Sequence, residues 1–532
     1  MNPAYFLIFA LQCLFPIFET AADEYVGISI VNTDTQLRDF TVTATAANGS
    51  RLQAGLLTLN PASQRAFLLQ EVVGPGAPSP GWIRIGSNAS GCTSYMASGA
   101  DQVLAGTDAN ESGSTVMWVP HISVNTGFTE LAHTDTLISI VNTGTVTASI
   151  NAQLMGLDGL TKGTLSISVP PNGSRIDRIS ELFAAVLPNN SLGGKTFEGY
   201  ARLSADVLIS VWQRIDTPLS RSMVRGISIP SQTSSAVLPH FVIGGGFGFD
   251  SILNIVNPGP VGANSLELRA FDDLGNAIGE TVRLTLRNGE GRRVSVAELF
   301  KIVTILTFPP PLVSGYILIQ QLPTAQPAAT SLIAALEIFA RESLGKTASM
   351  LYSASYSNAT RWTIPFATSS APFFSGYAIA NVTQVAAQAD VAVEVFNSAG
   401  SVVDRRVLSI SPGRRETGVI PSRLSSGYIR FTSNLPVYVT GTIGTTYEAI
   451  GSAAGASALA LSIFVEESFP FLDKPKLSYE GQTFRMHFHP SSQINVFNLR
   501  PGRLTFVCGE PATDDCPANS RRLWADGDMP AN

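Results

Sequence analysis

Charged side chains are scarce in this chain. Asp, Glu, Lys and Arg make up 14% of its 532 residues, well below the roughly 25% typical of soluble domains. Ser, Thr, Asn and Gly supply most polar positions instead, as expected for strands that expose one face. With a formal net charge of −6 and no cluster of Lys and Arg to neutralise phosphates, the sequence argues against nucleic acid as a partner.

Long apolar runs are also missing. No stretch beyond residue 22 reaches the roughly 18 uninterrupted apolar residues of a membrane helix, so no membrane span is expected in the mature chain. Residues 4–15 are apolar except for Gln12, and Pro16 and the small residues Thr20, Ala21 and Ala22 follow them. This order is typical of a signal peptide. We therefore expect residues 1–22 to be cleaved and the protein to be secreted or held at the cell surface.

Cysteines are few, with four in the whole chain. Cys508 and Cys516 flank Pro511, a spacing that predicts a disulfide-closed loop in an exported protein. The loop-entropy account credits such a bond with roughly 2.5 kcal/mol. Cleavage after residue 22 would remove Cys13 and leave Cys92 as the odd cysteine, which we expect to be a small buried hydrophobic side chain.

Fourfold repetition is the strongest positive feature. A short apolar strand that ends in Asn recurs at residues 28–32, 138–142, 253–257 and, more loosely, 378–381. A second phrase, Gly followed by an aromatic residue, begins at Gly81, Gly199, Gly315 and Gly427. Successive copies lie roughly 110 to 125 residues apart, which is the size of a whole domain and far longer than a solenoid or propeller unit.

Each copy is expected to be an antiparallel β-sandwich. In the third copy, short alternating strands are separated by turn residues at 258–260, 272–276 and 288–289, with no long helical period. The predicted fold is all-β, with four tandem immunoglobulin-like sandwiches and a small β-rich tail. The expected boundaries are 23–116, 117–233, 234–358 and 359–462 for the four repeats and 463–532 for the tail. We expect the repeats to form an extended rod, with the aromatic ring after each Gly filling the core between two sheets.

The strand phrases Ile-Val-Asn and Gly-Tyr-x-Arg resemble those of bacterial exported proteins built from tandem immunoglobulin-like β-sandwich repeats. The resemblance covers residues 25–460. It implies an extracellular scaffold or adhesive role and brings no catalytic residues with it. The Cys-Trp-Cys core of antibody domains is absent from this chain.

Histidines are the main candidates for chemistry. His121 and His240 each follow a Pro at the start of a repeat, but Phe366 follows the matching Pro365, so this position is expected to pack an aromatic-sized group. His487 and His489 share one face of a predicted strand and could bind one metal ion with a third ligand from elsewhere. The alternative for this pair is a solvent-facing role.

These features predict a non-enzymatic exported scaffold or adhesion-type protein. It would need no cofactor and would bind an extracellular protein, a glycan or an envelope partner. The alternative is an extracellular glycan-active or metal-dependent enzyme, or its accessory module, with a site in the C-terminal tail around His487, His489 and the cysteine loop.

Overall fold

The computed structural model divides into two units, Met1–Thr445 and Thr446–Asn532, which are described separately. The residues it describes in the first unit are 12–18, 24–74, 80–87, 93–100, 103–109, 113–127, 133–218, 220–228, 235–245, 248–259, 262–302, 310–322, 332–342, 345–370, 373–382, 387–420 and 424–445. In the second unit they are 476–479, 482–485 and 504–507.

The prediction of an all-β fold is confirmed, because antiparallel strands dominate the first unit. Repeat 1 contains β1 (Gln12–Ile17), β2 (Tyr25–Val31), β3 (Arg38–Ala46), β4 (Arg51–Leu59), β5 (Gln64–Leu68), α1 (Leu69–Val73), β6 (Gly81–Ser87), β7 (Thr93–Ala100) and β8 (Val103–Asp108). Repeat 2 contains β9 (Ser114–Asn125), β10 (Asp135–Asn142), β11 (Ala148–Gly156), β12 (Thr161–Val169), β13 (Ser174–Arg178), α2 (Ile179–Leu182), β14 (Thr196–Asp216) and β15 (Arg221–Arg225).

The other two repeats follow the same order. Repeat 3 contains β16 (Ser235–Ile243), β17 (Phe249–Val256), β18 (Asn264–Phe271), β19 (Ala277–Leu286), β20 (Gly291–Ser295), α3 (Val296–Leu299), β21 (Val313–Gln321), β22 (Ile333–Glu342) and β23 (Gly345–Ser353). Repeat 4 contains β24 (Ala359–Ala367), β25 (Phe373–Ala380), β26 (Ala389–Asn397), β27 (Val402–Ile410), β28 (Arg415–Val419) and β29 (Gly427–Thr445). In the second unit, β30 (Lys476–Tyr479) pairs with β31 (Gln482–Arg485) and β32 (Leu504–Val507).

Each repeat is a sandwich of two sheets with a constant strand order. In repeats 1 and 3, one sheet is β1-β6-β3-β4 or β16-β21-β18-β19, and the other is β5-β2-β7-β8 or β20-β17-β22-β23. In repeats 2 and 4, one long strand, β14 or β29, runs through both sheets and replaces the sixth and seventh strands. The second strand pairs with the fifth and the third with the sixth, as in immunoglobulin sandwiches. The first and seventh strands have exchanged sheets relative to that fold.

Strand β1 lies within the segment expected to be a signal peptide. It pairs with β6 from Gln12↔Gly86 to Ile17↔Gly81, and Cys13 and Phe15 are fully buried. Pro16 takes the place that Pro120, Pro239 and Pro365 take in the first strands of the other repeats. The apolar residues 12–18 thus contribute to the core of repeat 1 in this structure, and cleavage after residue 22 stays a prediction.

The second expected boundary also needs correction. Strand β9 starts at Ser114, so a boundary at residue 117 would cut this strand. The sequence signal was weak there because the strand begins with the polar residues Ser114 and Thr115 before its apolar part.

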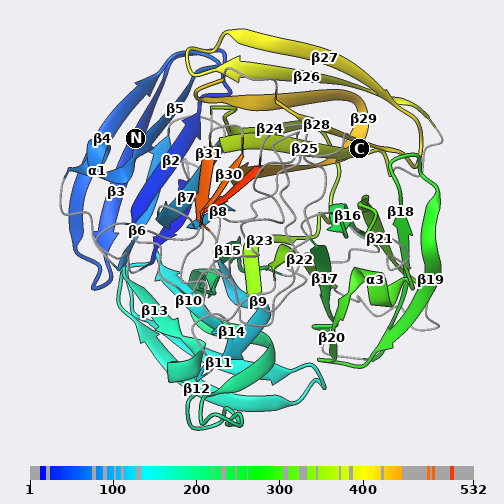
Figure 1. Cartoon of the computed structure of the whole chain (residues 1–532). Coiled ribbons are helices and arrows are strands. Elements are labelled where there is room, and N and C mark those ends of the chain that lie inside the picture. The colour runs from blue at the N-terminus through cyan, green and yellow to red at the C-terminus, as the bar shows by residue number, and fades with distance from the viewer. Residues whose placement is uncertain are drawn as a thin grey trace, which may run out of the picture. The chain divides into compact units, whose positions relative to one another are not determined.

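The four repeats close into a ring, so the prediction of an extended rod is wrong. At each junction, or seam, a backbone N–H at the start of a fifth strand donates to a carbonyl in the first hairpin turn of the preceding repeat. The four bonds are Ser174 to Ala47 (2.9 Å), Gly291 to Leu157 (2.9 Å), Arg415 to Asp273 (3.1 Å) and Gln64 to Ser398 (3.0 Å). The last bond joins repeat 4 to repeat 1, and Figure 1 shows these two repeats, yellow and blue, side by side.

The aromatic residue after each Gly strengthens the same seams. Its polar atom donates to a carbonyl in the second hairpin turn of the next repeat: Trp82 to Asn172 (2.9 Å), Tyr200 to Gly289, Tyr316 to Gly413 (2.6 Å) and Tyr428 to Ala62 (2.8 Å). All four acceptor residues have a positive φ. Tyr200, Tyr316 and Tyr428 belong to hydrophobic clusters that join two repeats, so the expectation that the rings fill the core between the sheets is wrong for them. Trp82 belongs to the core of repeat 1, as expected.

The hydrophobic cores follow the repeats but are not fully separate. The core of repeat 3 lies between its two sheets and includes Leu253, Leu266, Ile317 and Leu336. The core of repeat 1 extends to Leu137, Trp212 and Met223 of repeat 2. Burial of one continuous apolar surface stabilises both repeats together. This explains why the repeats pack against one another in a ring and are not independent domains.

Candidate functional site

The four seams share a backbone pattern and differ in their side chains. Three positions change from seam to seam: the residue after the Pro of the first strand, the residue before the Gly-aromatic pair, and the first residues of the fifth strand. In repeats 2, 3 and 4 the Pro and its successor form a bulge opposite the aromatic residue. A bulge redirects a side chain, and here it directs His121, His240 and Phe366.

Arg415 is the central side chain of the seam between repeats 3 and 4. It is 1% exposed. Its Nε donates to Asp273 Oδ1 at 2.7 Å, an Nη donates to Ser314 Oγ at 3.0 Å, and another Nη donates to the carbonyl of Gly315. Burial lowers the pKa of Arg415, whereas the Asp273 carboxylate opposes this shift. A buried guanidinium with these partners ties the two repeats together.

His240 lies against Arg415. The two side chains approach to 3.0 Å between Arg415 Nη1 and His240 Nδ1, and the hydroxyl of Tyr352 donates to the His240 carbonyl. Burial, together with the charge of Arg415, lowers the pKa of His240 to about 3. The imidazole is therefore neutral near pH 7 and can accept a hydrogen bond from the guanidinium.

The seam between repeats 2 and 3 contains a second ionic group. His121 Nε2 lies 3.1 Å from Glu198 Oε2 and 3.0 Å from Arg293 Nε. Arg293 also donates to Glu337 Oε2 at 3.1 Å. Burial would raise the pKa of Glu198, but the hydrogen bond and charge of His121 and the charge of Arg293 hold this pKa below its usual value.

Both histidine groups contain side chains found in acid–base sites, but their geometry serves the seams. Gln213 also fixes the position of His121, because its Nε2 donates to the His121 carbonyl at 2.8 Å. These ionisable groups bind partners from two repeats, although Nδ1 of His121 is buried without a hydrogen-bond partner. The prediction that the residue after Pro packs an aromatic-sized group gave no sign of this ionic bonding, because the partners are far apart in sequence.

The closing seam, between repeats 4 and 1, has neutral side chains instead. Gln64 stands at the position of Arg415. Its Nε2 donates to Ser29 Oγ at 2.7 Å, and its Oε1 accepts from Ser426 Oγ at 3.1 Å. Ser29 donates in turn to the Pro365 carbonyl at 2.6 Å. This chain of hydroxyl and amide groups replaces the guanidinium.

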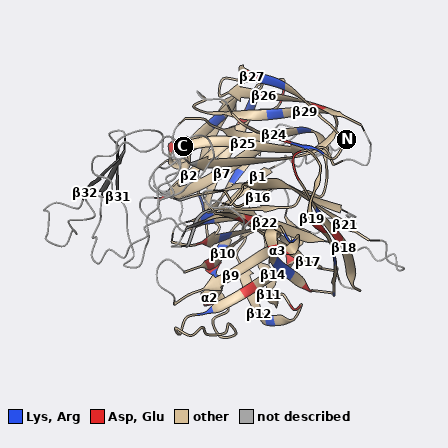
Figure 2. Ribbon diagram, turned by 45° about the vertical axis from the view of Figure 1, so that its right-hand side comes forward, with Lys and Arg blue, Asp and Glu red and all other residues tan. Residues whose placement is uncertain are grey.

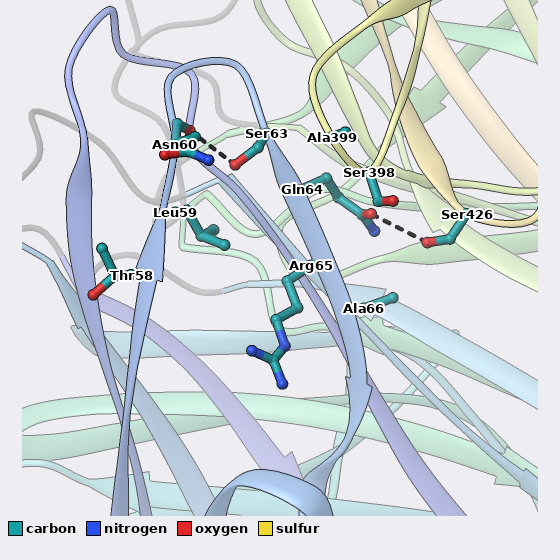
Figure 3. A pocket seen from close by; sticks show the side chains of 10 residues that line it. All are labelled: Thr58, Leu59, Asn60, Ser63, Gln64, Arg65, Ala66, Ser398, Ala399 and Ser426. Atoms are coloured by element: carbon teal, nitrogen blue, oxygen red, sulfur yellow. Dashed lines mark hydrogen bonds between the residues drawn. The ribbon is translucent and has the colours of Figure 1, made fainter.

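A pocket of about 460 Å³ opens beside this chain of hydrogen bonds. Figure 3 shows its lining side chains, which come from β4, β5, the turn between these two strands and the loops of repeat 4. They are Thr58, Leu59, Asn60, Ser63, Gln64, Arg65, Ala66, Ser398, Ala399 and Ser426. The volume lies within the roughly 300 to 1,000 Å³ of small-molecule sites. The lining is mostly hydroxyl and amide, with one guanidinium from Arg65, so this pocket is the candidate site.

The predicted site residues in the tail are not placed by the structure. His487, His489, Cys508 and Cys516 all lie outside the described residues, so the metal site and the Cys508–Cys516 disulfide stay predictions. Cys13, expected to be lost with a signal peptide, is instead disulfide-bonded. Within the described parts of the chain, no three His, Cys, Asp or Glu side chains are grouped as metal ligands.

The charged surface offers few further candidates. Figure 2 shows Lys, Arg, Asp and Glu scattered over a ribbon that is mostly of other residues. Over the same described ranges, no helix has the length and apolar character needed to cross a membrane.

The fold and its seams define a four-repeat all-β ring with a polar pocket at its closing seam. No protein-family profile and no curated protein matches the chain. Solved structures that align with it include a biofilm-associated protein BSP domain, with 10% identity, a TM-score of 0.14, and 76% of this chain and 95% of that chain covered.

Two further structures give similar values. A structure of the infectious bursal disease virus Gx strain aligns with 10% identity and a TM-score of 0.11, over 58% of this chain and 70% of that one. The enterotoxigenic E. coli adhesin CfaE aligns with 10% identity and a TM-score of 0.10, over 45% of this chain and 87% of that one. Scores this low carry no argument about fold or function.

Proposed function

We propose that this chain is a non-enzymatic exported scaffold or adhesion-type protein, in which the closed ring is a frame for binding an extracellular protein, glycan or envelope partner. The observation that carries the proposal is that ionisable side chains at two seams bind residues of a neighbouring repeat. His121, His240, Arg293 and Arg415 are all engaged in the seams, where they hold repeats together.

The exposed strands add support. On β12, the exposed residues include Thr161, Thr164, Ser166 and Ser168. Hydroxyl groups of this kind can take part in polar, water-mediated contacts with a partner. A frame that fixes several loops relative to one another also lowers the entropic cost of binding through those loops.

The test is attachment of the purified full chain to envelope preparations of the producing cells. We expect saturable binding that is lost after periodate or protease treatment of the preparation, according to whether the partner is a glycan or a protein. The same protein should release no product from a panel of glycan substrates.

The competing enzyme hypothesis makes the opposite prediction. Glycan turnover that depends on stoichiometric zinc, with both zinc and turnover lost in His487→Ala, would contradict the scaffold proposal. Zinc analysis of the full chain and of this variant is the direct measurement.

A further inference from the structure

The pocket at the closing seam differs in the size of its lining side chains from the seam between repeats 2 and 3 and from the seam between repeats 3 and 4. Five of its lining residues are Ser or Ala, and three of these, Ser398, Ser426 and Ala66, have larger counterparts at another seam. At the seam between repeats 2 and 3, the residues at the same positions are Leu157, Glu198 and Arg293. At the seam between repeats 3 and 4, the long side chain of Arg415 replaces Gln64 and fills the interior. The side chains that line the closing seam are therefore shorter than those at these two seams.

Arg65 gives this space its only charge. It is exposed on β5, and in Figure 3 its side chain extends along the pocket wall between β4 and β5. At the same position in repeat 2, Arg175 is bound by Asp177 through two hydrogen bonds of 2.7 and 3.1 Å. In repeat 1 the residue in place of Asp177 is Phe67, so Arg65 has no carboxylate partner on its own strand.

The remaining lining groups are neutral donors and acceptors. Asn60 presents an exposed side-chain amide, and Ser398 presents a hydroxyl. The N–H of Gln64 points away from β2 to reach Ser398. The N–H and C=O groups of alternate residues in an edge strand point to the same side, so those of Ala66 point in the same direction as the N–H of Gln64. Leu59 is the only large apolar lining residue, and it is only 5% exposed.

We propose that this pocket binds a sugar acid, a small hydroxyl-rich ligand in which a carboxylate accompanies the ring hydroxyls. The planar guanidinium of Arg65 pairs with the carboxylate, while the amide, hydroxyl and backbone groups bind the ring hydroxyls. A peptide is less suitable, because the lining offers no apolar pocket for its side chains. This inference deepens the proposed binding role and rests on it.

The experiment is calorimetric titration of the full chain with digalacturonate. Saturable binding is expected, with at least about a tenfold loss of affinity in Arg65→Gln because the charged hydrogen bonds disappear. Arg292→Gln is the matched control: Arg292 is exposed at the same position of repeat 3, so its loss should leave the affinity unchanged. Ser398→Leu should block binding by filling the pocket, since the seam bond uses only its backbone carbonyl. An unchanged melting temperature verifies the fold of each variant.

Four outcomes would overturn the proposal. They are no binding at millimolar digalacturonate, equal losses in Arg65→Gln and Arg292→Gln, inorganic phosphate or lactose binding as tightly as digalacturonate, and tighter binding of a short acidic peptide.

If Arg65→Gln loses digalacturonate but still attaches to the envelope preparation, the sugar-acid site is supported and the scaffold role rests on another surface. If attachment fails in the unaltered protein while digalacturonate binds, only the scaffold role is contradicted.

Discussion

At the scale of single residues, one Asn in each repeat organises a whole turn region. The side-chain nitrogen of Asn142 is buried and donates to the carbonyls of Val146, Val169 and Pro170, and its oxygen accepts from the N–H of Gly144 at 2.9 Å. Asn32 and Asn257 make the same set of bonds. The amide satisfies carbonyls that would otherwise be buried without partners, which explains why Asn ends the repeated strand phrase.

Replacing this side chain should destabilise the ring. Asn142→Ala leaves several buried polar groups without partners, and we expect a loss of about 2 to 4 kcal/mol in the free energy of unfolding. Urea denaturation measures it. Asn151, which is exposed on β11, gives the control: Asn151→Ala should stay within about 0.5 kcal/mol of the unaltered protein. Equal effects of the two substitutions would show that the hydrogen bonds of the Asn142 side chain do not stabilise the turn region.

His240 should make stability depend on pH. Its pKa is about 3 in the folded chain, below the ordinary value of about 6.5, so the unfolded chain binds the extra proton first. The groups that face it are Arg415, Tyr352 and, through Arg415, Asp273. This contribution to stability is complete above about pH 6.5 and decreases as the pH falls from there toward 3, by at most about 1.4 kcal/mol per pH unit.

The measurement compares urea denaturation of the unaltered protein and His240→Gln across this pH range. Other titrating groups contribute to both proteins, so the difference isolates one imidazole. We expect a shallower loss of stability at acid pH in the variant. Parallel curves would mean that His240 takes up its proton equally well in the folded chain.

At the scale of secondary-structure elements, β1 shows that an apolar strand and a leader can have the same composition. Both need a short hydrophobic run followed by small or polar residues, and composition alone does not separate them. The distinguishing sign is Pro16, because Phe15-Pro16 matches Val119-Pro120, Leu238-Pro239 and Ile364-Pro365. A structural Pro repeated at the same strand position indicates membership of the repeat.

A substitution in β1 tests this assignment. Phe15 is fully buried, so Phe15→Ala should lower the free energy of unfolding by about 3 to 5 kcal/mol through lost burial and a cavity. Leu56→Ala in β4 is the control, because Leu56 is 68% exposed and should change stability by less than about 0.5 kcal/mol. If Phe15→Ala has no effect on the purified protein, and its intact mass lacks residues 1–22, the segment is cleaved after all.

At the scale of the whole molecule, the sequence predicted the repeated unit but not its closure. Period-two strands and Gly, Asn and Pro turns define the sandwiches locally. Ring closure depends on contacts such as Tyr428 with Ala62 and Gln64 with Ser398, which join distant parts of the chain. A recurring Gly-aromatic pair fits an internal core as well as a seam, so the sequence alone did not choose between them. The pocket follows from closure and was missed for the same reason.

Closure of the ring changes which repeat lies nearer to repeat 1, and energy transfer between fluorophores can measure this difference. Fluorophores placed on the fourth strands, at Leu56 in repeat 1, Thr281 in repeat 3 and Val407 in repeat 4, report on exposed positions of equivalent strands. In the ring, repeat 4 neighbours repeat 1 and repeat 3 lies across from it, so energy transfer should be more efficient for the pair 56–407 than for the pair 56–281. In an extended rod the pair 56–407 is the farthest apart, and the order is the opposite. Tyr428→Phe removes one closing hydrogen bond, worth about 1 kcal/mol, and should leave the order intact, because Gln64, Ser29 and Ser426 still hold the seam.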